Sequence, residues 1–263
     1  MTEPIIVVEP KGHGSRPFAR LSAERVRSRA DVVDALERFQ RGVWIAPTAP
    51  AVDLLLTAPA ERSRGEQRVL IFEAKGARHG LLHALFRFVV APDEGIRLLP
   101  LDELAEVLGS PEREDLFIGG GVDEQAGAAV LYRGTLEPLV VPLTSFPARR
   151  GGPKPDPSAL EVTDFGHTVR LGEYEAATDA ILYEVDEGFR RRAKKRLLHE
   201  DRSWGGALRR LRIQKGLGRG DFAGISAKEI ARLERGEVKR PHPGTMASLA
   251  KRLGVRPEKI ATF

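Results

Sequence analysis

Three charged residues in the first third of the chain have the types that a metal-dependent nuclease uses. Glu73 and Lys75 follow the apolar run Val69–Phe72, and Asp53 lies upstream of it. In such nucleases two carboxylates hold Mg²⁺ and the lysine stabilises developing charge. Asp53, however, lies in a helix-like run rather than on a preceding strand. A metal-dependent nuclease that uses Asp53, Glu73 and Lys75 is therefore kept only as an alternative function. We expect that the chain is not an enzyme.

A second pattern with chemical potential is the pair His79 and His83, which has the spacing of two zinc ligands on one helix. Gly80 follows His79, where a zinc peptidase would carry its catalytic glutamate, and no third ligand is evident. The sequence contains no cysteine, which excludes disulfides, cysteine zinc sites and thiol nucleophiles. We therefore expect neither a metal site nor a cofactor.

Charge is distributed unevenly along the 263 residues. From Asp186 to Phe263 the chain carries 21 Lys and Arg against 9 Asp and Glu, whereas the preceding part carries 21 against 28. A basic tail on an acidic body is typical of a chain in which only one part meets a polyanion. Within this tail, Phe189–Leu198 is a charged helical pattern that fits both a solvated connector and a strip touching phosphates.

We expect neither a signal peptide nor a membrane span. The N-terminus begins without a basic leader, and no apolar run reaches the roughly 18 residues that a membrane span needs. We therefore expect a cytoplasmic protein.

Over residues 4–118, short β-branched runs alternate with helical patterns. This alternation predicts helices layered on a mostly parallel sheet. The predicted strands are Ile5–Val8, Val43–Ala46, Val69–Phe72, Ile96–Leu99 and Leu116–Ile118, and the predicted helices are Ala23–Gln40, Ala51–Thr57, Arg78–Val90 and Leu101–Leu108.

Residues 128–185 have the pattern of a β-rich domain, with short strand-like runs separated by turn residues. Within it, Arg149–Pro157 contains three prolines, which fix φ and remove backbone donors, so we expect a loop there. Through Val162–Gly166 and Ala180–Tyr183, this part resembles a small bacterial β domain of unknown function. The predicted strands are Ala129–Arg133, Leu139–Leu143, Ala159–Thr163, Thr168–Gly172 and Ala180–Glu184.

The last 60 residues contain five helix signals. A first helix carries Leu208, Leu211 and Arg212 on one face and ends at Gly216, and Leu217–Phe222 follows as a very short second helix. Ser226 and Glu229 have the spacing of a capping box at the start of a third helix, which ends at Gly236. A fourth helix has the apolar stripe Met246, Leu249, Ala250 and Leu253 before Gly254, and Pro257 suits the first turn of a fifth that includes Ile260.

Three segments of this region resemble, in the same order, the lambda-repressor-like (Cro-type, XRE-like) helix-turn-helix family. They are Leu208–Leu217, Ile230–Gly236 and Leu249–Val255. The resemblance covers residues 204–263. It implies a DNA-binding domain whose third helix, residues 226–236, enters the major groove.

The resemblance also implies roles for single residues. Arg212 and Glu234 match the pair that ties the first helix to the end of the third, and they should form a salt bridge because an unpaired buried glutamate is costly. Major-groove contacts are implied for Ala227 and Lys228 at the start of the third helix and for Arg232 one turn on. A contact with the DNA backbone or the first base pair is implied for Arg219 in the second helix. Phosphate contacts are implied for Arg235, Lys239 and Arg240, which follow the third helix.

The sequence departs from the family in one place. The segment from Leu217 to Glu234 is shorter than the family norm and rich in glycine, which leaves the second helix barely one turn, and Ala227 replaces an expected polar reader. Because this helix normally braces the recognition helix, weak or partner-dependent DNA binding and a repurposed protein-interaction adaptor stay open as alternatives.

Taken together, these patterns predict an α+β multidomain chain. An α/β domain spans 1–118, a β-rich domain 119–185, a basic connector helix 186–203 and an all-α helix-turn-helix domain 204–263. The predicted function is a transcriptional regulator of double-stranded DNA, with an autoregulating antitoxin or defence-operon regulator as its narrower form. We expect a homodimer, because one short helix reads few bases, and a toxin or effector as partner of the N-terminal body.

Overall fold

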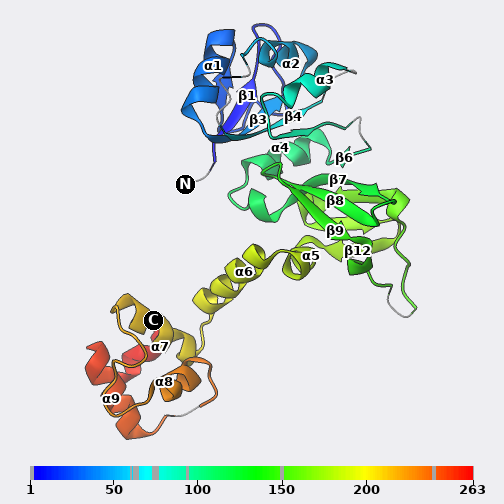
Figure 1. Cartoon of the computed structure of the whole chain (residues 1–263). Coiled ribbons are helices and arrows are strands. Elements are labelled where there is room, and N and C mark those ends of the chain that lie inside the picture. Colours follow the sequence, from blue (N-terminus) through cyan, green and yellow to red (C-terminus); the bar gives the residue numbers. More distant parts are fainter. Residues whose placement is uncertain are drawn as a thin grey trace. The chain divides into compact units, whose positions relative to one another are not determined.

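A five-stranded parallel sheet forms the first part of the chain (Figure 1). The structure, a computed structural model, describes residues 3–59, 61, 65–72, 77–92, 95–148, 151–238 and 241–262. The strand order is β2-β1-β3-β4-β5, and every neighbouring pair is parallel. The predicted strands at 5–8, 43–46 and 69–72 are confirmed to within a few residues. The strands are β1 (Ile5–Val8), β2 (Glu24–Val26), β3 (Arg41–Ala46), β4 (Glu66–Ile71) and β5 (Phe88–Val90).

Three helices follow strands of this sheet: α1 (Arg29–Arg38), α2 (Ala49–Leu55) and α3 (Ala77–Leu82). Alternate strand residues on one face, such as Trp44 and Val69, pack in one core with apolar side chains of α1 and α2. The other strand face is buried as well, so the strands are nearly continuous apolar runs, as expected for a parallel sheet.

Two predicted helices are partly wrong. The helix predicted at Ala23–Gln40 starts only at Arg29, because Glu24–Val26 pairs with β1 as β2. The helix predicted at Arg78–Val90 ends at Leu82, and Phe88–Val90 pairs with β4 as β5. In both cases the helical spacing of apolar residues extends over a short edge strand. That strand forms because it pairs with a strand elsewhere in the sequence.

Two antiparallel sheets follow the parallel one. The first has the order β6-β7-β8-β9, with α4 (Leu101–Gly109) between β6 and β7 in sequence, and the second has the order β10-β11-β12. These strands are β6 (Arg97–Leu98), β7 (Phe117–Asp123), β8 (Ala128–Arg133), β9 (Pro138–Pro142), β10 (Leu160–Thr163), β11 (Thr168–Leu171) and β12 (Tyr174–Ala177). Short 3-10 turns η2 to η5 lie at Arg113–Asp115, Leu143–Ser145, Pro157–Ala159 and Asp164–Gly166.

The prediction made from apolar runs was wrong for some of these segments. The runs predicted at Ile96–Leu99 and Leu116–Ile118 do form strands, but they pair antiparallel with each other rather than in the parallel sheet. The run Ala180–Glu184 lies in a helix, α5 (Thr178–Val185), with Ile181 and Leu182 buried and Tyr183 exposed. Short apolar runs do not distinguish a strand from one buried side of a helix.

In the described part of residues 187–263 the regular elements are all helices. The helices are α6 (Glu187–Glu200), α7 (Trp204–Gln214), α8 (Ala227–Glu234) and α9 (Pro243–Leu253), followed by the 3-10 helix η6 (Pro257–Thr262). One core joins α7, α8, α9 and η6 through residues that include Leu208, Ile230, Leu249 and Ile260. The predicted helix with Leu208 and Leu211, the one capped by Ser226 and the one with the stripe from Met246 to Leu253 are therefore confirmed.

The chain divides into two compact units, Met1–Asp186 (unit 1) and Glu187–Phe263 (unit 2). The finer division of unit 1 into domains at 1–118 and 119–185 stays a prediction. In the described part of the chain, none of the helices combines the length and the apolar character that crossing a bilayer requires.

Candidate nucleic-acid interface

The first helix of the candidate interface, α7, is built to lie directly against α8. Ser203 caps its start by accepting a hydrogen bond from the Gly206 N–H at 3.1 Å. At Gly205 an added Cβ would lie 2.5 Å from the Leu233 carbonyl oxygen, so only glycine allows this approach to the end of α8. The close approach brings the side chain of Arg212 within reach of the last turn of α8.

A buried carboxylate joins three segments of unit 2. The Glu234 side chain, 1% exposed, accepts from Arg212 Nε at 2.6 Å and from Arg219 Nε at 2.9 Å. Arg212 also donates through Nη1 to the Leu217 carbonyl oxygen at 2.6 Å. The predicted Arg212–Glu234 pair is therefore present, and it is extended by Arg219.

The second helix predicted at Leu217–Phe222 is absent from unit 2, since the described residues 215–226 form turns instead. Gly218 and Gly220 lower the helix propensity of this stretch, and Gly224 has a left-handed backbone (φ 77°). Phe222 and Ile225 still reach the core, so the segment is anchored without being helical.

Polar contacts hold this turn in place. Within it, the Gly218 N–H donates to Asp221 Oδ2 at 2.7 Å, and from α9 Arg252 Nε donates to the Asp221 carbonyl oxygen at 2.9 Å. Together with the contacts of Arg212 and Arg219, these bonds tie the turn to α7, α8 and α9. The network therefore takes over the bracing that a full second helix would give to α8.

The helix α8 has one apolar side and one exposed side. Its cap, Ser226, accepts from the Glu229 N–H at 3.1 Å, which is half of the predicted capping box. Ile230 and Leu233 are buried in the core, whereas Ala227, Lys228 and Arg232 are exposed. The structure thus brings together, on the outer side of α8, the three residues expected to face a DNA groove.

The end of α8 places a glutamate beside two of the predicted DNA-contacting arginines. Gly236 has a left-handed backbone (φ 71°), and the Glu237 N–H donates to the Arg232 carbonyl oxygen at 3.1 Å. In this position Glu237 accepts from Arg235 Nε at 2.6 Å and from Arg232 Nε at 3.2 Å. Sequence reasoning missed Glu237, although a carboxylate just past a helix end and close to two arginines is a readable signal.

These contacts keep Glu237 charged. The hydrogen bond from Arg235 is the main cause that lowers the pKa of the Glu237 carboxyl below its ordinary value; burial opposes it, and the hydrogen bond from Arg232 lowers the pKa further. At neutral pH the two guanidinium groups therefore share one negative charge, which a DNA phosphate would have to replace or complement.

The remaining predicted contacts have different surroundings. Arg219 is held by Glu234 but keeps 43% of its side chain exposed. Lys239 and Arg240 lie outside the described residues. The predicted basic connector contains α6, whose exposed side chains include Arg190, Arg191, Lys194 and Lys195.

Comparison with known protein families agrees with this geometry. Residues 204–263 match the family model described as a helix-turn-helix domain. Unit 2 contains a helix-turn-helix domain. The prediction made from Leu208–Leu217, Ile230–Gly236 and Leu249–Val255 is thereby confirmed. The match begins at residue 204 and so does not include residues 128–185, whose resemblance to a small β domain stays a prediction. Searches of curated proteins and of solved structures gave no match to the chain.

The residues considered for metal chemistry do not form a described site. Asp53 is exposed on α2, while Glu73 and Lys75 lie outside the described residues. His79 lies in α3 and His83 follows that helix. Among the residues that the structure describes, no three His, Asp or Glu side chains gather closely enough to hold a metal ion.

Proposed function

We propose that this chain is a DNA-binding transcriptional regulator that reads its site with the outer side of α8. The observation that carries the proposal is the placement of Lys228 and Arg232 on that side, in a domain matched to the helix-turn-helix family. Lysine and arginine in the major groove donate to guanine O6 and N7, and such a contact contributes about 1–3 kcal/mol of discrimination.

Positive charge outside α8 supports affinity rather than sequence reading. Arg235 lies just past α8, and the helix α6 exposes Arg190, Arg191, Lys194 and Lys195. Arginine and lysine contacts to phosphates fix the position of a protein on DNA and make its binding depend on salt.

The narrower form of the proposal is a homodimeric repressor of its own operon, such as an antitoxin or a defence-operon regulator. Two copies of α8 placed about 34 Å apart would read two half-sites on one face of a duplex, which offsets the few bases that one short helix contacts. Unit 1 would then bind a partner protein or an effector. Light scattering of the full chain with and without its DNA site tests the dimer.

Binding assays with the full chain test the proposal. We expect fluorescence anisotropy with a random-sequence duplex to show affinity falling at least about tenfold between roughly 50 and 200 mM salt. Sequencing of genomic fragments that the chain retains should yield a short enriched motif, including one near its own promoter.

Two results would count against this function. Affinity for the duplex that does not depend on salt would contradict phosphate contacts. Retained fragments without a shared motif would contradict base reading by α8, and would leave at most a non-specific DNA contact.

Replacing Glu237 with glutamine is expected to tighten DNA binding by up to about fivefold. The variant removes the charge that holds Arg232 and Arg235, so both become available to phosphates or bases, and the gain stays small because exposed ion pairs are weak. Anisotropy titrations at one salt concentration measure the change. The matched control is Glu258→Gln, which removes the same charge from an exposed position on η6. Equal effects of the two variants would show that only net charge matters.

A further inference from the structure

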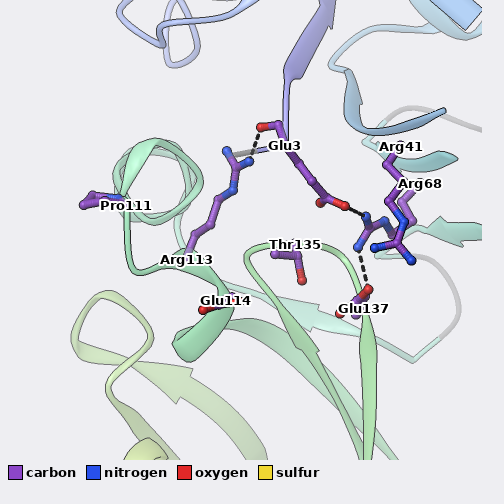
Figure 2. A pocket seen from close by; sticks show the side chains of 8 residues that line it. All are labelled: Glu3, Arg41, Arg68, Pro111, Arg113, Glu114, Thr135 and Glu137. Atoms are coloured by element: carbon purple, nitrogen blue, oxygen red, sulfur yellow. Dashed lines mark hydrogen bonds and ion pairs between the residues drawn. The ribbon is translucent and has the colours of Figure 1, made fainter. Parts of the chain in front are cut away.

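A hollow of about 440 Å³ lies in unit 1, near the amino ends of β1, β3 and β4. Its wall includes Glu3, Arg41, Arg68, Arg113, Thr135 and Glu137 (Figure 2). Glu3 lies two residues before β1, Arg41 lies in β3 and Arg68 in β4. Arg113 lies in η2, and Thr135 and Glu137 lie in the turn between β8 and β9. The volume lies within the range of small-molecule sites.

At the centre of this wall is a guanidinium group that is almost fully buried. Arg68, 2% exposed, forms ion pairs with Glu3 and with Glu137, whose Oε1 lies 3.0 Å from Arg68 Nη1. Figure 2 shows the Glu3 side chain reaching toward Arg68, with Thr135 between Arg113 and Glu137. A charge buried to this degree is found where it is paired and hydrogen-bonded.

Four polar atoms of this wall are nevertheless without a hydrogen bond. Within the described part of the chain they are Arg68 Nε, Arg68 Nη1, Glu3 Oε2 and Thr135 Oγ1, all buried. Arg68 Nη1 has the nearby charge of Glu137 but no hydrogen bond to it, whereas the other three atoms have no partner at all. Of these three, Arg68 Nε donates, Glu3 Oε2 accepts, and the Thr135 hydroxyl can do both. Buried polar atoms of folded proteins are normally satisfied, so a bound molecule with complementary groups would complete the wall.

The charges around the hollow are balanced. Three arginines (Arg41, Arg68 and Arg113) face three glutamates (Glu3, Glu114 and Glu137). A simple anion such as phosphate would have to displace the carboxylates that already pair with Arg68, and a simple cation would meet the guanidinium groups. A molecule that carries one charge of each sign meets neither obstacle.

We propose that this hollow binds a small zwitterion, namely a free amino acid or a molecule with the same ammonium and carboxylate groups. The ligand carboxylate accepts from Arg68 Nε and from the Thr135 hydroxyl, while the ligand ammonium donates to Glu3 Oε2. Exposed Arg41 stands at the rim, where it pairs with Glu66 at 2.6 Å. The site belongs to unit 1 and does not depend on DNA binding by unit 2.

Calorimetry and thermal unfolding of the full chain test the site. Each proteinogenic amino acid is added in turn at about 10 mM, well above a millimolar dissociation constant. We expect at least one of them to bind and to raise the unfolding temperature. Its N-acetyl and its amide derivatives, which each lack one of the two charges, should bind at least about tenfold more weakly.

A pair of variants separates this site from binding elsewhere. Thr135→Val keeps the side-chain shape and removes a hydroxyl that has no partner, so the unliganded protein should stay folded while ligand affinity falls about fivefold or more. The control Arg20→Gln alters an exposed arginine that lines a different hollow and should leave affinity unchanged.

Several outcomes would overturn the proposal. They are the absence of binding by every amino acid, equal binding of the N-acetyl or amide derivative, and unchanged affinity of Thr135→Val. Inorganic phosphate that binds and competes with the amino acid would show an anion site instead. Because none of these readouts uses DNA, they are independent of the proposed regulatory function.

Discussion

Replacing Glu234 with alanine is expected to unfold the helix-turn-helix domain, by lowering its free energy of unfolding by about 3–5 kcal/mol. The substitution leaves Arg212, which is largely buried, without its carboxylate, and it releases Arg219 from the same partner. Hydrogen exchange of the α7 and α8 amides in the full chain measures the loss within unit 2. The control Glu258→Ala, at an exposed position, should change the protection of these amides little.

A second comparison shows whether the charge pair itself is responsible. Breaking one side of a buried pair is more damaging than replacing both sides by apolar residues of similar volume. The double variant Arg212→Met with Glu234→Leu should therefore be more stable than Glu234→Ala. Full protection of α7 and α8 in Glu234→Ala would contradict the role of Glu234 as the link between helix, turn and helix.

The double variant Lys228→Ala with Arg232→Ala is expected to lose sequence preference while keeping salt-dependent affinity. Each base contact is worth about 1–3 kcal/mol, so the loss of two contacts should weaken binding to the enriched motif by at least roughly thirtyfold. Affinity for a scrambled duplex should change much less, since phosphate contacts from Arg235 and from α6 persist. Anisotropy with both duplexes at one salt concentration measures the ratio.

The matched control removes two charges from unit 1, where Arg16 and Arg20 are exposed. Arg16→Ala with Arg20→Ala should leave the ratio between motif and scrambled duplex unchanged. An unaltered footprint of Lys228→Ala with Arg232→Ala on the motif would refute the assignment of these residues as base readers.

The helix-turn-helix domain was predictable because its signals are local. A cap at Ser226, a left-handed residue at Gly236 and apolar side chains at helical spacing each depend on a few neighbouring residues. The second helix was the exception. Its glycines weaken helix formation, and tertiary contacts then decided that the segment is a turn held by Arg212, Arg252 and the Arg219–Glu234 pair.

In unit 1 the strands were easier to predict than their partners. The buried runs of β1, β3 and β4 are apolar enough to be recognised alone. The edge strands β2 and β5 are short, and the apolar spacing of each one fits the helix next to it. Only their pairing with β1 and β4 shows that they are strands. The direction of β6 and β7 likewise follows from pairing and not from their composition.

The amino-acid sequence by itself therefore determined the presence of a basic helix-turn-helix domain, its main helices and the Arg212–Glu234 pair. Only the tertiary structure decided that Glu237 holds Arg232 and Arg235, and that Glu3, Arg68 and Thr135 surround one hollow. The reason is physical: local periodicity fixes which side of an element is buried, whereas a polar side chain finds its partner through the packing of segments far apart in the chain.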